Sequence, residues 1–288
     1  RKASGLAGGR QQVAGLVAGT RRPRRAGGLS VPGRRLPLLR EEVSEQAGAF
    51  VATTMNAFFR FPHTPHLAWL GRGEPRDDKV LSEAEAAELL SAEVVLEEKV
   101  DGANLGFSLS ADGELRVQNR GQYLAEPHSG QFARLPQWLA IHSSGIGDAL
   151  LEHADNGLML FGEWCAARHS LDYTRLPDWF LLFDVFEGSS GHFWSSSRRD
   201  DLAAELGLAT TPCLAQGRFT LSDLSAKVQL WPSRFRDGPL EGIVVRRESG
   251  GWCERRAKLV RGDFTQGITD HWRNRQIQWN RLSTELAT

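Results

Sequence analysis

The tetrapeptide Lys99-Val100-Asp101-Gly102 combines a nucleophile, an acid and a flexible turn. It follows the apolar run 94–96 and two glutamates, so the lysine stands at the end of a predicted buried strand. Buried lysines are rare unless paired, and Asp101 and the glutamates are candidate partners. A lysine becomes nucleophilic when its pKa falls from about 10.4 to roughly 7–8, which burial or a nearby cation favours and Asp101 alone opposes. For this pattern alone, a solvated lysine before an Asp-Gly turn is the plain alternative.

More charged side chains occur at the ends of other predicted strands, namely Arg120, Glu163, Glu241, Arg256 and Lys258. Two or more cations at one site suit phosphates. Carboxylates suit Mg²⁺ or a ribose hydroxyl. Taken singly, the two glutamates could be solvated strand ends, and Arg256 and Lys258 could form one exposed strand face, because residues two apart point the same way. Together with Lys99, the set indicates a nucleotide site with a covalent lysine.

The elements that must position these residues are strands mixed with helices. Residues 104–109 and 115–119 alternate about an Asp-Gly turn, which predicts a β-hairpin leading to Arg120. Other strands are predicted over 94–99, 157–164, 179–186, 240–246 and 252–260, and helices over 83–90, 131–153, 198–206, 221–228 and 263–286. Because strands and helices do not alternate regularly, we expect an α+β fold.

Composition narrows the class of protein. Hydrophobic residues make up 41% and charged residues 24% of the 288 residues, as in ordinary globular proteins. No apolar run approaches the ~20 residues of a membrane span, so no membrane is expected as a partner. The three cysteines are far apart and odd in number. This pattern argues against a disulfide framework or a cysteine-based zinc site and favours a cytoplasmic location.

The charge is uneven along the chain. Residues 1–54 hold ten basic and three acidic residues, a net +7, and residues 55–288 hold 25 basic and 32 acidic residues, a net −7. The first tract is rich in Arg, Gly and Ala, and we expect it to be disordered. A nucleic-acid-binding tail, a targeting segment and a tract outside the natural protein are three explanations. We favour the third, with translation starting at Met55, and expect one domain over 55–288.

The motifs occur in the order found in the covalent nucleotidyltransferases, the superfamily of RNA ligases, DNA ligases and capping guanylyltransferases. The chain resembles this superfamily over about residues 56–265. The segments 61–67 and 162–170 look most like ATP-dependent RNA ligases. The matching motifs are Lys99-Val100-Asp101-Gly102, Arg120-Gly121, Phe161-Gly162-Glu163-Trp164, Phe183-Asp184-Val185-Phe186, Glu241-Gly242-Ile243-Val244-Val245 and Arg256-Ala257-Lys258.

The resemblance implies a nucleotidyltransferase domain, the ATP-grasp-like adenylation domain of ligases, built of antiparallel sheets with flanking helices. It implies that Lys99 attacks the α-phosphate of ATP to form lysyl–AMP, which passes to an RNA 5′-phosphate before a 3′-hydroxyl displaces it. The other roles it implies follow the motifs. Glu97 or Glu98 lies by the adenine, Phe183 stacks on the adenine face, and Asp101 belongs to the nucleotide site. Arg120 and Glu163 hold the ribose and phosphate, and Glu241 places Mg²⁺ or Mn²⁺. Lys258 contacts the α-phosphate and could lower the pKa of Lys99.

The chain departs from the family pattern in two ways. Arg256 stands where the family usually has a lysine, and arginine is bulkier and cannot give up its proton in the same way. Only 30 residues follow Lys258, too few for the C-terminal OB domain of DNA ligases and capping enzymes. We therefore expect no such domain, and expect RNA to be held by the core, by the predicted C-terminal helix (Arg273, Arg275, Arg281) or by a partner.

Three functional classes remain open. An ATP-dependent RNA ligase is favoured. Another covalent nucleotidyltransferase, a DNA ligase or capping-type enzyme, is the alternative within enzymes, and a non-catalytic nucleotide- or nucleic-acid-binding module is the alternative outside them. RNA ends and ATP are the expected partners, and an end-processing kinase or phosphatase could prepare the ends.

Overall fold

The computed structural model describes residues 58–73, 75, 79–267 and 276–283, which all lie within one compact unit spanning 41–288. The basic tract 1–54, Met55, Arg273 and Arg275 are outside the described residues, so the predictions for them stay predictions. None of the described helices is long and apolar enough to cross a membrane.

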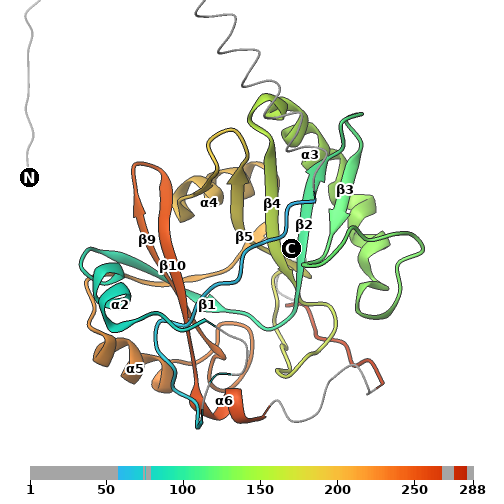
Figure 1. The fold of residues 1–288 in the computed structure, drawn as a ribbon. Helices are drawn as coiled ribbons and strands as arrows, with labels where there is room; N and C mark the ends of the chain where they lie inside the picture. The colour runs from blue at the N-terminus through green and yellow to red at the C-terminus, as the bar shows by residue number, and fades with distance from the viewer. Residues whose placement is uncertain (1–57, 74, 76–78, 268–275, 284–288) are drawn as a thin grey trace, which may run out of the picture. The chain divides into compact units, whose positions relative to one another are not determined.

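Most strands of the described region join one antiparallel sheet (Figure 1). We had expected several antiparallel sheets. Its order is β3-β2-β4-β5-β6-β10-β9-β1-β8, and β7 pairs with β5 in parallel. The strands are β1 (Val94–Lys99), β2 (Ala103–Leu109), β3 (Leu115–Gln118), β4 (Leu158–Trp164), β5 (Phe180–Glu187), β6 (His192–Trp194), β7 (Ala209–Thr210), β8 (Cys213–Gly217), β9 (Gly242–Ser249) and β10 (Trp252–Val260). The predicted strands and the hairpin are confirmed, whereas β6, β7 and β8 were not predicted.

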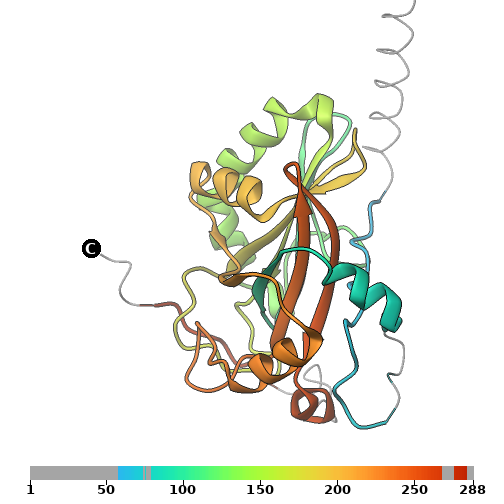
Figure 2. The ribbon, with the colours of Figure 1, turned by 90° about the vertical axis from the view of Figure 1, so that its left-hand side faces the viewer.

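The helices cover the sheet in two groups. They are α2 (Glu83–Leu89), α3 (Leu135–Glu152), α4 (Ser196–Glu205), α5 (Leu221–Leu230) and α6 (Gly262–Gly267). Helix α2 begins with the capping box formed by Ser82 and Glu85, as its sequence predicts. In Figures 1 and 2, α3 and α4 lie toward the top of the molecule and α2 and α5 lie below them.

Two large hydrophobic clusters underlie these groups. One packs residues of α3 and α4 against β2, β4 and β5, with Trp138, Trp164 and Phe180 among its buried members. The other packs α2 and α5 against β1, β9 and β10, with Leu89 and Leu96 among its buried members. The sheet therefore has two separately packed halves, and the strands of both halves contribute to the site described below.

The predicted helix over 263–286 is only partly correct. Helix α6 is described over Gly262–Gly267, and the described residues 276–283 are not helical. Trp279 forms an isolated β-bridge with Ala167, and Leu282 forms one with Leu176. The buried Asn280 side chain explains this path, because its amide bonds the carbonyls of Cys165 and Ala167. Side-chain spacing alone cannot reveal such long-range backbone pairing.

Candidate active site

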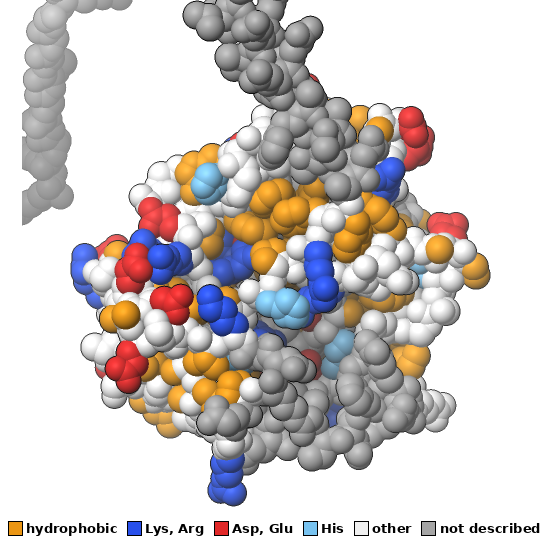
Figure 3. All heavy atoms as spheres, in the orientation of Figure 1, with side chains coloured by type: hydrophobic (Ala, Val, Ile, Leu, Met, Phe, Trp, Pro, Cys, Tyr) orange, Lys and Arg blue, Asp and Glu red, His pale blue; other side chains and the backbone are white. Residues whose placement is uncertain are grey.

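A cavity of about 600 Å³ lies between the two halves of the sheet. Strands of both halves line it, with β1, β9 and β10 on one side and β2, β4 and β5 on the other. Figure 3 shows Lys, Arg and His side chains gathered near the middle of one face, with acidic side chains visible between them. Nine of the ten predicted site residues line this cavity: Glu97, Glu98, Lys99, Asp101, Arg120, Glu163, Phe183, Arg256 and Lys258.

The tenth residue, Glu241, lies directly beside Lys99. Strands β1 and β9 are antiparallel and pair Lys99 with Gly242, which brings the preceding glutamate to the lysine. The Lys99 Nζ to Glu241 Oε1 distance is 2.6 Å. Gly242 is required at this point, because a Cβ there would be 2.4 Å from the carbonyl oxygen of Leu259 on β10. Strand register thus creates a close ion pair from residues far apart in sequence.

The charges around Lys99 keep its proton on. Burial by itself lowers the pKa of Lys99, but Glu241 above all, followed by Glu163 and Asp101, raises it above the ordinary lysine value. Without substrate, the Lys99 side chain is therefore an ammonium ion. Its pKa in this state is not lowered as a nucleophilic lysine requires. Lys258 was expected to lower this pKa, and the carboxylates outweigh any such effect.

Two glutamates near Lys99, the buried Glu241 and the half-buried Glu163, have raised pKa values. Burial raises the pKa of Glu163 to about 7, although the charge of Lys99 opposes this. Burial likewise raises the pKa of Glu241 to about 7, again against Lys99. Glu163 Oε1 accepts a hydrogen bond of 2.9 Å from the amide of Gly102. Because burial disfavours the charged form of both carboxyls, a further cation that enters the site would favour their ionised form.

Asp101 organises the loop after β1. Its Oδ2 accepts hydrogen bonds from the amides of Ser170, at 2.7 Å, and Leu171, at 3.1 Å. Its own amide donates to the Tyr173 hydroxyl at 2.9 Å. Val100 is buried in the cluster that contains Tyr173. These contacts fix the chain on the far side of Lys99, so Asp101 is a structural as well as a cavity-lining residue.

The donor set near Lys99 fits a divalent cation of the magnesium type. Glu241 Oε2 is buried and has no hydrogen-bond partner among the described residues. The part of the chain that the structure describes holds no group of three or more His, Cys, Asp or Glu side chains that could bind a metal ion. Magnesium usually takes one or two protein carboxylates and completes its shell with phosphate and water. Glu241 is thus a suitable single ligand.

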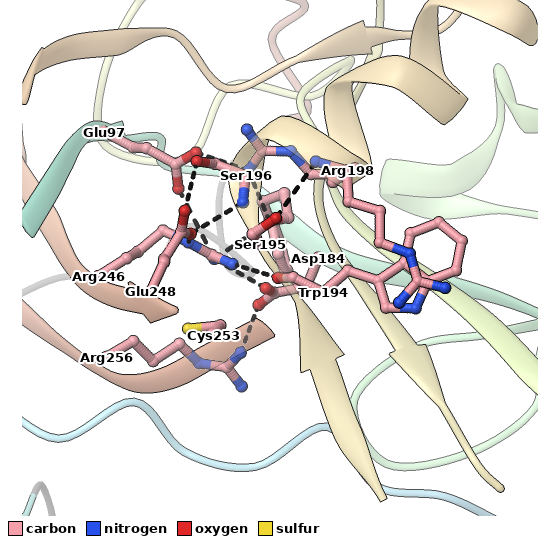
Figure 4. A network of polar contacts seen from close by, with 12 residues as sticks. Glu97, Asp184, Trp194, Ser195, Ser196, Arg198, Arg246, Glu248, Cys253 and Arg256 are labelled. Carbon is pink, nitrogen blue, oxygen red and sulfur yellow. Dashed lines mark hydrogen bonds and ion pairs between the residues drawn. The ribbon is translucent and has the colours of Figure 1, made fainter. Parts of the chain in front are cut away.

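Glu97 lines the cavity and also belongs to a buried charge network (Figure 4). Its carboxylate pairs with Arg199 at 2.6 Å and lies 3.8 Å from Arg246. Arg246 also bonds Asp184 at 2.7 Å. Burial raises the pKa of Glu97, and Arg199 opposes that effect most strongly. Neither Arg199 nor Arg246 was predicted, since a buried arginine on a helix or strand has no sequence signature of its own.

Arg256 is held in the same network. Its Nη1 bonds Asp184 Oδ2 at 2.6 Å, and its guanidinium lies over the rings of Phe193, at 4.1 Å, and Phe61, at 4.6 Å. Lys258 lines the cavity two residues further along β10, nearer in register to Lys99. Arg256 is therefore held by Asp184 and by two aromatic rings.

Among the cavity residues that the sequence did not predict, two have buried side-chain polar atoms without a hydrogen-bond partner in the described part of the chain. Asn104, which pairs with Glu163 across β2 and β4, has both side-chain polar atoms buried and without hydrogen-bond partners among the described residues. Thr211 has a buried hydroxyl that also lacks a hydrogen-bond partner within the described part of the chain. Asn104 lies five residues after Lys99 on the next strand, a spacing that could have identified it. Thr211 follows the unpredicted strand β7.

A family model and several solved structures match this chain. A family model described as RNA ligase matches residues 92–260. No curated protein sequence matches the chain. Among solved structures, Naegleria gruberi RNA ligase with PPi matches with a TM-score of 0.52 and 18% identity, over 75% of this chain and 65% of that chain. A point mutant of that ligase with ATP and Mn matches with a TM-score of 0.51 and 18% identity, over 73% of this chain and 64% of that chain. At this identity they show the fold alone, and the chain spans less than two thirds of their length.

Proposed function

This chain belongs to the RNA ligase family, and we propose that it is an ATP-dependent ligase that joins RNA 5′-phosphate and 3′-hydroxyl ends through a lysyl–AMP intermediate. The observation that carries the proposal is the position of Lys99. It lies at the end of β1 in a cavity, 2.6 Å from a buried carboxylate, with the cations Arg120 and Lys258 lining the same cavity. The structures of Naegleria gruberi RNA ligase with PPi, and with ATP and Mn, support ATP as the substrate.

In the first step, Lys99 Nζ attacks the α-phosphorus of ATP. A phosphorus–nitrogen bond forms, the bond between the α-phosphorus and the bridging oxygen breaks, and pyrophosphate leaves with the electron pair. Lys258 and Arg120 stabilise the negative charge that builds up on the phosphate oxygens.

Lys99 must lose its proton before it attacks. Glu241 is the nearest acceptor and also the main group that stabilises the ammonium ion. Glu241, with its unpaired Oε2, and the substrate phosphates would hold a divalent cation, which would neutralise phosphate charge and weaken the hold of Glu241 on the Lys99 proton. The carboxyl of Glu163, whose pKa burial raises to about 7 and whose charge acts on Lys99, is a second group that can take up a proton.

The nucleoside occupies the remainder of the cavity. Phe183 presents a half-buried ring from β5 and stacks on the base. Asn104 and Glu163 lie side by side across β2 and β4 and hold the ribose hydroxyls, which would supply hydrogen-bond partners to the buried Asn104 side chain.

The second and third steps transfer AMP and close the RNA chain. An oxygen of the RNA 5′-phosphate attacks the phosphorus of lysyl–AMP and displaces Lys99, forming a 5′–5′ pyrophosphate linkage. The RNA 3′-hydroxyl then attacks the 5′-phosphate, and AMP leaves. This chemistry needs 5′-phosphate and 3′-hydroxyl ends, so a kinase and a phosphatase activity must supply them wherever breaks carry other ends. RNA repair in the cytoplasm is the setting we propose.

Joining of a labelled RNA tests the proposed function. A 5′-labelled RNA strand, offered as a nick, a stem-loop or free ends with ATP and Mg²⁺, is expected to give a longer product and a transient adenylylated strand. The Lys99→Ala variant should give neither from ATP. When it is supplied with pre-adenylylated RNA, it should still join the ends, because only the first two steps need the lysine. Joining by Lys99→Ala from ATP would overturn the proposal.

A further inference from the structure

A segment that precedes the first helix borders the cavity. It consists of residues 58–67, drawn in blue in Figure 1, and it passes in front of the sheet from the side of β2 and β3 to β10. At one end, the Gln118 side chain at the end of β3 donates to the carbonyl of Phe59 at 2.8 Å. At the other end, Leu67 is buried in the hydrophobic cluster of α2 and α5. We call residues 58–67 the crossing segment.

Backbone hydrogen bonds place the crossing segment beside Lys258. The amide of Lys258 donates to the carbonyl of Pro65 at 2.8 Å, and the amide of Leu67 donates to the carbonyl of Lys258 at 2.7 Å. The order across this half of the sheet is therefore β1, β9, β10 and the crossing segment. Neighbouring strands lie about 4.8 Å apart. A phosphate chain that starts at Lys99 on β1 and passes Lys258 on β10 reaches the crossing segment next.

Two donor side chains of the crossing segment, His63 and Thr64, line the cavity. They lie between Pro62 and Pro65, which fix their own φ angles and confine the residue before each of them to extended conformations. Phe61 is buried before this pair, with its ring 5.0 Å from that of Phe161. His63 is exposed and Thr64 is partly buried, so the pair borders the open side of the cavity. No hydrogen bond or ion pair within the described part of the chain holds either side chain.

We propose that His63 and Thr64 bind the β- and γ-phosphates of ATP and hold the pyrophosphate that leaves when Lys99 is adenylylated. The inference rests on the proposed function as an ATP-dependent ligase. A histidine ring N–H and a threonine hydroxyl both donate hydrogen bonds, and such bonds are stronger when the acceptor is charged. As the bond between the α-phosphorus and the bridging oxygen breaks, the electron pair passes to that oxygen. Donors at the pyrophosphate stabilise the charge that it gains.

Binding of an unreactive ATP analogue gives the first test. The analogue is α,β-methylene-ATP with Mg²⁺, whose bridging carbon cannot leave, and AMP is the comparison ligand because it lacks the outer phosphates. In the double variant His63→Ala, Thr64→Val, we expect the analogue to bind about tenfold more weakly and AMP to bind with native affinity. An equal loss of affinity for the analogue and for AMP would overturn the inference.

Two single variants serve as controls for this binding measurement. His63→Gln keeps a hydrogen-bond donor at the same position, so it should bind the analogue nearly as the native protein does. His192→Ala removes an exposed histidine of β6 that does not line the cavity, and it should leave both affinities unchanged. A loss for His192→Ala as large as that for the double variant would contradict a local role of the crossing segment.

The separate reaction steps give the second test. In the double variant, lysyl–AMP should form more slowly from ATP, and its conversion back to ATP should need about tenfold more pyrophosphate. Joining of pre-adenylylated RNA should keep its native rate, because no pyrophosphate takes part in that step. If joining slowed as much as lysyl–AMP formation, the crossing segment would hold RNA, and the inference would be overturned.

The two proposals fail in different ways. A native protein that is covalently labelled by ATP, with a double variant that binds the analogue at native affinity, would keep the ligase function and overturn the role of His63 and Thr64. A selective loss of analogue binding in the double variant, without labelling of the native protein, would support the phosphate-binding role and overturn the covalent mechanism. A native protein that binds neither the analogue nor AMP would overturn both.

Discussion

At the scale of single residues, Arg256 has a role that its motif position does not suggest. The guanidinium bonds Asp184 and lies over two aromatic rings, so its planar shape and its charge are both used. Asp184 in turn bonds the fully buried Arg246. Arg256 therefore stabilises the wall of the cavity more directly than it serves the phosphates.

Replacing Arg256 by lysine tests this role. Arg256→Lys keeps the charge but loses the planar stacking, and we expect the free energy of unfolding to fall by roughly 1–2 kcal/mol in urea denaturation. Arg255→Lys, on the same strand but half exposed and paired with Glu88 at the surface, should have little effect. Unchanged stability together with faster nucleotide transfer would instead place Arg256 at the phosphates.

The raised pKa values of Glu163 and Glu241 predict a pH dependence of stability. Both carboxyls have folded-state pKa values of about 7 against an ordinary value of 4.5. Between these values the folded protein keeps protons that the unfolded chain has lost. The stability that these two groups contribute is therefore complete below about pH 4.5 and is lost as the pH rises to about 7.

Glu163→Gln isolates one of these contributions. Glutamine keeps the acceptor for the Gly102 amide but does not titrate, so the free energy of unfolding of the variant should fall less than that of the native protein between pH 5 and pH 8. Glu205→Gln, on the exposed side of α4, is the control and should follow the native curve. Parallel curves for native protein and Glu163→Gln would show that the carboxyl of Glu163 does not titrate abnormally.

At the scale of elements, the segment 276–283 supports the loop that carries the site. Asn280 donates to the carbonyls of Cys165 and Ala167 and accepts a bond from the amide of Tyr173. The Tyr173 hydroxyl in turn accepts a hydrogen bond from the amide of Asp101. A chain of hydrogen bonds thus connects this segment with the residue two positions after Lys99.

Asn280→Ala should weaken both stability and catalysis. It leaves three buried backbone groups with fewer partners, and we expect a loss of roughly 2–4 kcal/mol in the free energy of unfolding. Gln278→Ala removes an exposed side chain bonded to Arg168 and should cost about 0.5 kcal/mol or less. Equal effects of the two substitutions would mean that the segment does not support the loop.

The elements also show how far the sequence alone reaches. Strands with clear patterns, such as β1 and the hairpin β2–β3, were predicted because apolar residues and the Asp-Gly turn are local signals. The short strands β6, β7 and β8 have weak local patterns and exist because neighbouring strands pair with them. Thr211 was missed for the same reason, and the ion pair between Lys99 and Glu241 required the register between β1 and β9.

At the scale of the described unit, the cavity joins the two halves of the sheet. Each half has its own hydrophobic cluster, and the cavity residues come from both. A nucleotide that contacts Glu98 and Lys258 on one side and Phe183 and Glu163 on the other therefore connects the halves. Binding to the folded state alone stabilises it by an amount that grows with ligand concentration.

AMP binding tests this connection without allowing chemistry, because AMP has no pyrophosphate to lose. At about 100 times its dissociation constant, AMP should raise the free energy of unfolding by roughly 2.7 kcal/mol. Hydrogen exchange should slow in both β1 and β4, whereas ribose 5-phosphate, which lacks the base, should give much less protection. Slowed exchange in one half only would contradict a site shared by both halves.

Detection of the covalent intermediate is the most direct test of the proposed ligase function. Native protein is mixed with ATP and Mg²⁺, digested under alkaline conditions, and its peptides are analysed by mass spectrometry. We expect one AMP group, labile in acid, on Lys99, and no adduct in Lys99→Ala. A folded native protein that carries no AMP, or carries it on another residue, would contradict the proposal that Lys99 is the nucleophile of an RNA ligase.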